Sequence, residues 1–190
     1  MKYNDTSRLI MKVALKLFSE KGYYSTTTKQ IAQDANVNEL TLFRHFGSKA
    51  NLFQLTTEHY VVDAHVDHII DNVDDLDFKQ SMELITKRIC ALYEENRKLY
   101  KVQMKLADDE KDFVKLKLSR KMIGVLERYF EKLKKDQLVN GNPHMMATTI
   151  ISSLLGALTV DILGEGTVTN ISWQEIAEEY VKQFVALYQM

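Results

Sequence analysis

The sequence of 190 residues contains one cysteine and one proline. The single cysteine, Cys90, excludes an internal disulfide. The N-terminal segment MKYNDTSR lacks the apolar run of a secretory signal peptide, so we expect a cytoplasmic protein. The sequence also lacks a glycine-rich phosphate loop, an H-E-x-x-H motif and a serine-nucleophile motif. We therefore expect a protein that is not an enzyme and that carries no cofactor.

Long stretches of period-two alternation, which would indicate a β-sheet, are also missing from the sequence. Apolar residues recur at helical spacing instead, and the only proline, Pro143, fits the first position of a helix capped by Asn142. The pattern predicts an all-α protein of about nine helices. The expected helices occupy residues 9–18, 27–35, 39–46, 48–71, 77–93, 96–107, 109–137, 142–163 and 172–188.

The segment from Thr27 to Lys49, TTKQIAQDANVNELTLFRHFGSK, carries the clearest pattern in the chain. Thr27 and Gln30 have the spacing of a capping box, which marks the start of a helix. Asn38 is a good N-cap for a second helix, which Gly47 ends. The segment therefore predicts two short helices joined by a tight turn.

The second of these helices has two different faces. Leu42 and Phe46 are four residues apart and can face the core together. The same geometry turns polar side chains outward: Glu39, Thr41, Arg44 and His45. An exposed polar helix of this kind suits the major groove of DNA. A helix–turn–helix pair can also be purely structural, and the spacing alone leaves both alternatives open.

Residues 9–53 resemble the DNA-binding domain of the TetR (tetracycline-repressor-like) family of transcriptional regulators. The matching residues are Ala14, Phe18, Gly22-Tyr23, Thr27-Thr28, Ile31-Ala32, Ala35-Asn36-Val37, Thr41-Leu42-Phe43, His45-Phe46, Ser48-Lys49 and Leu52. Two residues depart from the family pattern. Leu40 stands where the family usually has Gly, Ala or Pro, and Phe43 stands where it usually has Tyr. Phe43 has no hydroxyl to donate to a phosphate, so we expect its ring to pack against the sugar–phosphate edge.

The charge distribution agrees with a DNA-binding N-terminal domain. Residues 1–55 hold eight Lys/Arg and four Asp/Glu, a formal charge of +4, and the remainder holds 17 and 22, a charge of −5. A basic region confined to one domain provides the local attraction that phosphate binding requires. A small excess of this kind over 55 residues can also arise by chance.

Individual side chains suggest roles on DNA. The guanidinium fork of Arg44 suits guanine O6 and N7. Thr41 can contact a thymine methyl group or a phosphate. Glu39 can accept from a cytosine amine, or it can simply stabilise the N-terminus of its helix. The family resemblance implies phosphate contacts from three further residues, namely Thr28, His45 and Lys49.

The resemblance also implies a homodimer that binds a double-stranded, near-palindromic operator, with the last two long helices pairing with their copies. Ser152 and Gly156 are small and four residues apart, which would allow a close helix approach. The alternative is a helix buried in its own subunit. Residues 145–163 are long enough to suggest a membrane span, but they contain five Ser/Thr residues and one Asp. We therefore expect no membrane partner.

By resemblance, residues 1–50 form the DNA-binding domain and residues 51–190 bind an unidentified effector and dimerise. Candidate pocket residues in the middle helices are Tyr93, Tyr100, Met104, Met122 and Tyr129. Ligand pockets and cores share apolar linings, and ordinary core is the favoured interpretation of each of these side chains. The effector can equally be a partner protein. His59, His65 and His68 with Asp63, Asp67 and Asp71 are interpreted as a solvated helix surface and not as a metal site.

The family favours a repressor over an activator. The alternative function is a helical adaptor whose helix–turn–helix no longer reads DNA. The departure from the family pattern at Phe43 is consistent with this alternative.

Overall fold

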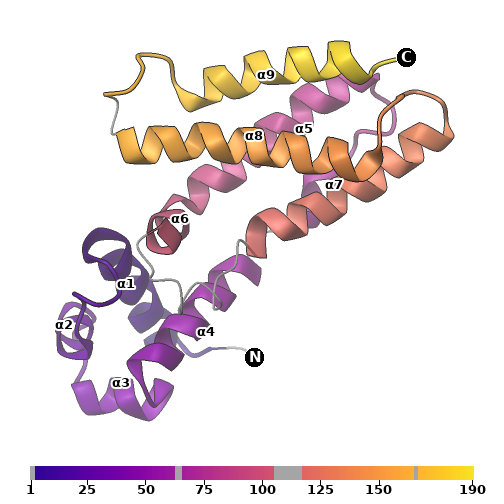
Figure 1. Cartoon of the computed structure of the whole chain (residues 1–190). Helices are drawn as coiled ribbons and strands as arrows, with labels where there is room; N and C mark the ends of the chain where they lie inside the picture. Colours follow the sequence, from indigo (N-terminus) through magenta and orange to yellow (C-terminus); the bar gives the residue numbers. More distant parts are fainter. Residues whose placement is uncertain (1–2, 63–65, 105–116, 165–166) are drawn as a thin grey trace. The chain divides into compact units, whose positions relative to one another are not determined.

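A computed structural model describes residues 3–62, 66–104, 117–164 and 167–190 (Figure 1). Within these residues the chain forms nine α-helices and one short 3-10 helix, η1, which confirms the predicted all-α fold. The helices are α1 (Asp5–Lys21), α2 (Thr28–Asp34), α3 (Glu39–Phe46), α4 (Lys49–Val62), η1 (Val66–Ile70), α5 (Phe78–Glu95), α6 (Arg97–Met104), α7 (Lys117–Lys135), α8 (Pro143–Gly164) and α9 (Trp173–Tyr188).

The helices group into two compact units. The first unit comprises Met1–Ala64 and Asn96–Lys117, and the second comprises His65–Glu95 and Leu118–Met190. In the first unit α6 packs against α1, although the two helices are far apart in the sequence. The two units are defined by packing alone. The predicted division into a DNA-binding domain, residues 1–50, and an effector-binding and dimerisation domain, residues 51–190, stays a prediction.

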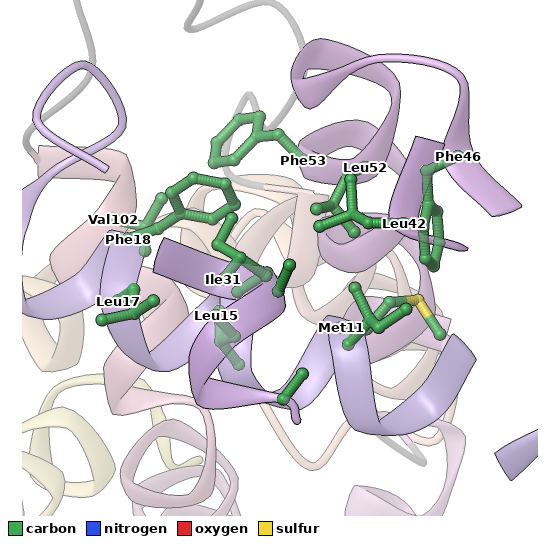
Figure 2. Close-up of a cluster of buried hydrophobic side chains, with 14 of the residues drawn as sticks. Met11, Leu15, Leu17, Phe18, Ile31, Leu42, Phe46, Leu52, Phe53 and Val102 are labelled. Carbon is green, nitrogen blue, oxygen red and sulfur yellow. The ribbon is translucent and has the colours of Figure 1, made fainter. Parts of the chain in front are cut away.

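One apolar cluster holds the first unit together. Figure 2 shows its side chains converging from separate helices. The buried members from α1 to α4 and α6 include Ile10, Met11, Phe18, Ile31, Leu42, Phe46, Leu52, Phe53, Leu99 and Val102. Because α2 and α3 have only seven and eight residues, they are too short to be stable alone and depend on this cluster.

The predicted helix ends are confirmed by local hydrogen bonds. Thr27 and Gln30 form the reciprocal capping box at the start of α2. The Asn38 side chain accepts from the Leu40 amide at 2.8 Å, and Gly47 ends α3 with a positive φ of 71°. Each of these interactions joins groups close together in the sequence, which is why the pattern of residues predicts them.

The expectation of one long helix from Ser48 towards Asp71 is wrong. Within the described residues α4 spans Lys49–Val62, and Val66–Ile70 form a separate 3-10 helix, η1, where the expectation had α-helix. Asn72 then takes a φ of 55°, which no α-helix can continue through. The parts of other expected helices at residues 105–107 and 109–116 lie outside the described residues.

The second unit is built around α9, which packs against both α5 and α8. Its buried side chains include Met82, Ile89, Tyr93, Leu126, Phe130, Leu154, Trp173 and Phe184. Among the described residues, α8 is the one helix long and apolar enough to cross a membrane, with a mean hydropathy of 1.7. It buries Met146, Ile150, Leu154 and Leu158, but only 39% of its apolar window is buried inside the protein.

Gly47 provides a test of how α3 ends. Its φ of 71° is rare for residues with a side chain, and an added Cβ would meet nothing within 4 Å. We therefore expect Gly47→Ala to lower the free energy of unfolding by about 1–2 kcal/mol through backbone strain alone. The control is Gly124→Ala in α7, where the added Cβ makes an ordinary contact with Arg128 and should stabilise the helix by about 0.5–1 kcal/mol. Urea unfolding followed by circular dichroism measures both, and equal effects would contradict the assigned backbone strain.

Candidate nucleic-acid interface

The turn between α2 and α3 fixes how the second helix follows the first. Asn36 takes a positive φ of 52°, and the Val37 amide donates back to the Ala32 carbonyl at 2.9 Å. Asparagine tolerates this left-handed conformation better than most residues. The backbone thus closes α2 and leads directly to the Asn38 cap of α3.

Helix α3 divides into a buried and an exposed side. Leu42 and Phe46 are buried in the cluster of Figure 2, as predicted. Arg44 is exposed, and the exposed fraction is 75% for Leu40 and 41% for Phe43. The remaining candidate residues of this helix are half-buried, namely Glu39, Thr41 and His45. The helix therefore presents a mixed apolar and basic surface.

A hydrogen bond joins the starts of the two helices. The Thr28 hydroxyl donates to the Glu39 carboxylate at 2.6 Å. A hydroxyl has one proton, so Thr28 can donate to a phosphate only by breaking this bond. Glu39 likewise uses one of its acceptor positions inside the protein. This geometry supports a positioning role for Glu39 at the start of α3.

His45 is attached to the start of α1. Its Nδ1 lies 2.9 Å from the Ser7 hydroxyl, and Ser7 is itself buried. When Ser7 donates to Nδ1, the neutral ring carries its proton on Nε2, which is the tautomer that can donate to a phosphate. The contact therefore fixes the ring of a predicted phosphate ligand.

Lys49 is the first residue of α4, and its ammonium lies 4.2 Å from the centre of the Tyr23 ring. Tyr23 in turn packs edge-on against Phe53, with ring centres 5.0 Å apart. The Ser48 hydroxyl accepts from the Asn51 amide at 3.0 Å and so caps the same helix. A lysine held at a helix N-terminus places positive charge where backbone amides also favour an anion.

Sequence reasoning missed three contributors to this surface. Leu40 stands out in the sequence only as a departure from the family pattern, although its position off the Leu42–Phe46 stripe indicates exposure. Ser7 and Tyr23 act through contacts with residues far along the chain, 38 positions away for Ser7 and His45. Such contacts leave no local signal in the sequence.

The five predicted pocket residues lie in both units. Tyr93, Met122 and Tyr129 are buried in the second unit, and the Tyr93 hydroxyl lies 3.2 Å from that of Ser119. Burial raises the pKa of Tyr129 above its ordinary value. Tyr100 and Met104 belong to α6 in the first unit. A shared pocket of all five stays a prediction.

Other chemistries have little support in the described residues. No group of three His, Cys, Asp or Glu residues in this part of the chain could hold a metal ion. His68 and Asp71 form an exposed pair at 2.6 Å, while Asp63 and His65 lie outside the described residues. Burial, with a smaller contribution from Glu178, raises the pKa of Cys90 to about 12, so its thiol stays protonated and is a poor nucleophile.

Residues 10–56 match the model of the family described as bacterial regulatory proteins, tetR family. The HTH-type transcriptional regulator YerO of Bacillus subtilis, itself uncharacterized, is 28% identical over 133 residues, which are 68% of this chain and 42% of YerO. IcaR, the biofilm operon icaADBC negative transcriptional regulator of Staphylococcus epidermidis, is 32% identical over 66 residues, 35% of each chain. The matched segments thus span less than half the length of these curated relatives.

The fold also matches a crystal structure of a proposed TetR-family transcriptional regulator from Mesorhizobium loti MAFF303099. The TM-score is 0.81 with 21% sequence identity, and the match covers 97% of both chains. At 21% identity the match shows a shared fold, and this fold covers nearly the whole chain.

The Thr28–Glu39 hydrogen bond can be tested by a double-mutant cycle. Thr28→Val removes the donor and keeps the shape, and Glu39→Gln removes the charge of the acceptor. We expect a coupling energy of about 1–2 kcal/mol in urea unfolding, because the acceptor is a carboxylate. Thr27 has its own partner, Gln30, so the pair Thr27→Val and Glu39→Gln is the control and should be additive. Additivity in both pairs would contradict the bond.

Proposed function

This chain belongs to the TetR family of bacterial regulatory proteins, and we propose that it acts as a dimeric transcriptional repressor in the cytoplasm. It binds a near-palindromic double-stranded DNA operator through α3 and is released by a small-molecule effector. The observation that carries the proposal is the orientation of α3, whose apolar side is buried while its Arg44 side is exposed.

The contacts around α3 support distinct roles on DNA. Arg44 reads guanine with its guanidinium fork, and Thr41 contacts a thymine methyl group or a phosphate. Phe43, 41% exposed and without a hydroxyl, packs against the sugar–phosphate edge. Glu39 positions the start of α3 through Thr28. Phosphate contacts come from His45 and Lys49, which fix the register without reading sequence. Thr28 joins them only where a phosphate replaces Glu39 as the acceptor of its hydroxyl proton.

The positive charge of residues 1–55, +4 against −5 for the remainder, supports DNA binding by the first unit. Attraction to phosphates is sequence-independent and salt-dependent. The negative second part of the chain reduces non-specific association there. Binding would therefore be directed to α3 and the helix ends beside it.

Exposed apolar residues on α8 and α9 support a dimer. They are Met145, Val160 and Leu163 on α8 and Ile176 and Leu187 on α9. Ser152 and Gly156 are exposed on α8 and would let a second copy approach closely. A two-fold pairing would present two α3 helices to half-sites about 34–36 Å apart. IcaR is a negative regulator, which supports a repressor here.

The test is selection of binding sites from a random duplex library with the purified full chain at near-physiological salt. Recovery of a palindromic motif with half-sites about one helical turn apart would support both the regulator and the dimer. If the protein binds duplexes but no sequence is enriched, the proposal is overturned in favour of the alternative, a helical adaptor that does not read DNA. The departure from the family pattern at Phe43 is the reason for that alternative.

Lys49→Ala should weaken binding to every duplex, because the ammonium contacts phosphate and not a base. The slope of log affinity against log salt should fall by about 0.9 for each phosphate that the variant no longer neutralises, hence by about 2 in a dimer. Fluorescence anisotropy with the selected operator and a scrambled duplex measures this. Lys135→Ala, which removes the same charge from the second unit, is the control and should leave the slope unchanged. An effect of Lys49→Ala on the operator alone would refute the phosphate contact.

Leu40 should read a thymine methyl group, because it is the most exposed large apolar side chain on α3. Replacing the contacted thymine by uracil should weaken binding of the wild-type chain about fivefold, near the value of one buried methyl group. The Leu40→Ala variant should bind thymine and uracil operators equally. Thymines outside the selected motif provide the control positions. If Leu40→Ala keeps the full thymine preference, another side chain makes this contact.

A further inference from the structure

Helices α5 and α9 pack against each other in the second unit, and residues of both line a groove outside the residues assigned above. Its volume is about 750 Å³. Buried residues on its walls include Thr86, Cys90 and Val181, and exposed charged residues of both helices stand at its edge. None of the five predicted pocket residues lines it.

The size and lining of the groove fit a small organic molecule. Small-molecule sites usually have volumes of about 300–1,000 Å³, with mostly apolar walls and a few polar groups. Leu84, Ala91 and Val181 supply apolar surface here. A partner helix would need a longer apolar surface than these few side chains provide.

The charged edge of the groove is negative overall. Its lining includes three carboxylates, from Glu83, Glu94 and Glu178, against the two ammonium groups of Lys87 and Lys182. Lys182 is paired at 3.0 Å with Glu179, a carboxylate that does not line the groove, and weaker attractions to Glu178 and Glu83 add to the pair in raising the pKa of Lys182. This excess of carboxylate favours a positively charged ligand.

Two buried groups on the wall have properties that suit such a ligand. The Thr86 hydroxyl makes no hydrogen bond within the described residues, although the residue is only 2% exposed. An unsatisfied buried hydroxyl costs free energy that a ligand's donor or acceptor can recover after a side-chain rotation. Burial and the charge of Glu178 raise the pKa of Cys90 to about 12, so the neighbouring thiol adds no charge.

We propose that the α5–α9 groove binds an amphipathic organic cation. Its apolar body lies against Leu84, Ala91 and Val181, and its positive group lies beside Glu178. This binding goes beyond the proposed repressor function and does not depend on DNA recognition.

The proposed dimer surface would leave this groove open. Leu187 follows Glu178 by nine residues, which places the two side chains about 180° apart around α9. The exposed apolar side of α9 is therefore opposite to the groove side. A second copy bound through Leu187 would not cover Glu178.

Isothermal titration of the full chain with tetraphenylphosphonium and tetraphenylborate tests the proposal, because the two ions have nearly the same shape and opposite charge. We expect the cation to bind at least about tenfold more tightly. Glu178→Gln should weaken binding of the cation about fivefold, whereas Glu131→Gln on α7 makes the same charge change outside the groove and should have no effect.

Ala91→Phe provides a steric test, because Ala91 is exposed and a larger side chain would fill part of the groove. Cation binding should be abolished while the unfolding temperature stays within about 3 °C of the wild type. Equal affinity for both ions, tighter binding of the anion, or unchanged cation binding by Glu178→Gln and Ala91→Phe would overturn the proposal. Site selection on the same variants keeps this result separate from DNA binding.

Discussion

Burial of Leu42 and Phe46 in the cluster of the first unit is the constraint on which the proposed DNA-binding surface depends. Helix α3 has eight residues and could not hold its shape alone. Once these two side chains pack against α1, α2 and α4, the helix has no freedom to rotate. The outward direction of Arg44 and Leu40 is therefore set by buried residues on the opposite side of the helix.

Polar contacts then fix the side chains around this helix. Glu39 is held by Thr28, His45 by Ser7, and the Lys49 ammonium lies over an aromatic ring. The first two contacts connect α2 and α1 to α3, and the third connects the start of α4 to the loop between α1 and α2. Because side chains that are ordered before binding lose less entropy on binding, these contacts would favour the proposed binding of a phosphate backbone.

The second unit uses the same helix packing for other purposes. One side of α9 packs against α5 and α8, and its remaining surface divides into an apolar side at Leu187 and a charged side at Glu178. A surface for a second copy and a groove for a small molecule can thus share one helix without competing. That division would allow dimerisation and ligand binding to occur together.

The sequence by itself determined the all-α fold, the helix caps at Thr27 and Asn38, and the burial of Leu42, because these follow from spacings of a few residues. It wrongly placed residues 66–70 in the same α-helix as α4, since a cap signal marks where a helix begins but not how far it continues. Only the tertiary structure decided that Glu39 bonds Thr28 and that α5 and α9 enclose a groove. Those features join residues separated by eleven positions or many more, and packing, which no local pattern encodes, brings them together.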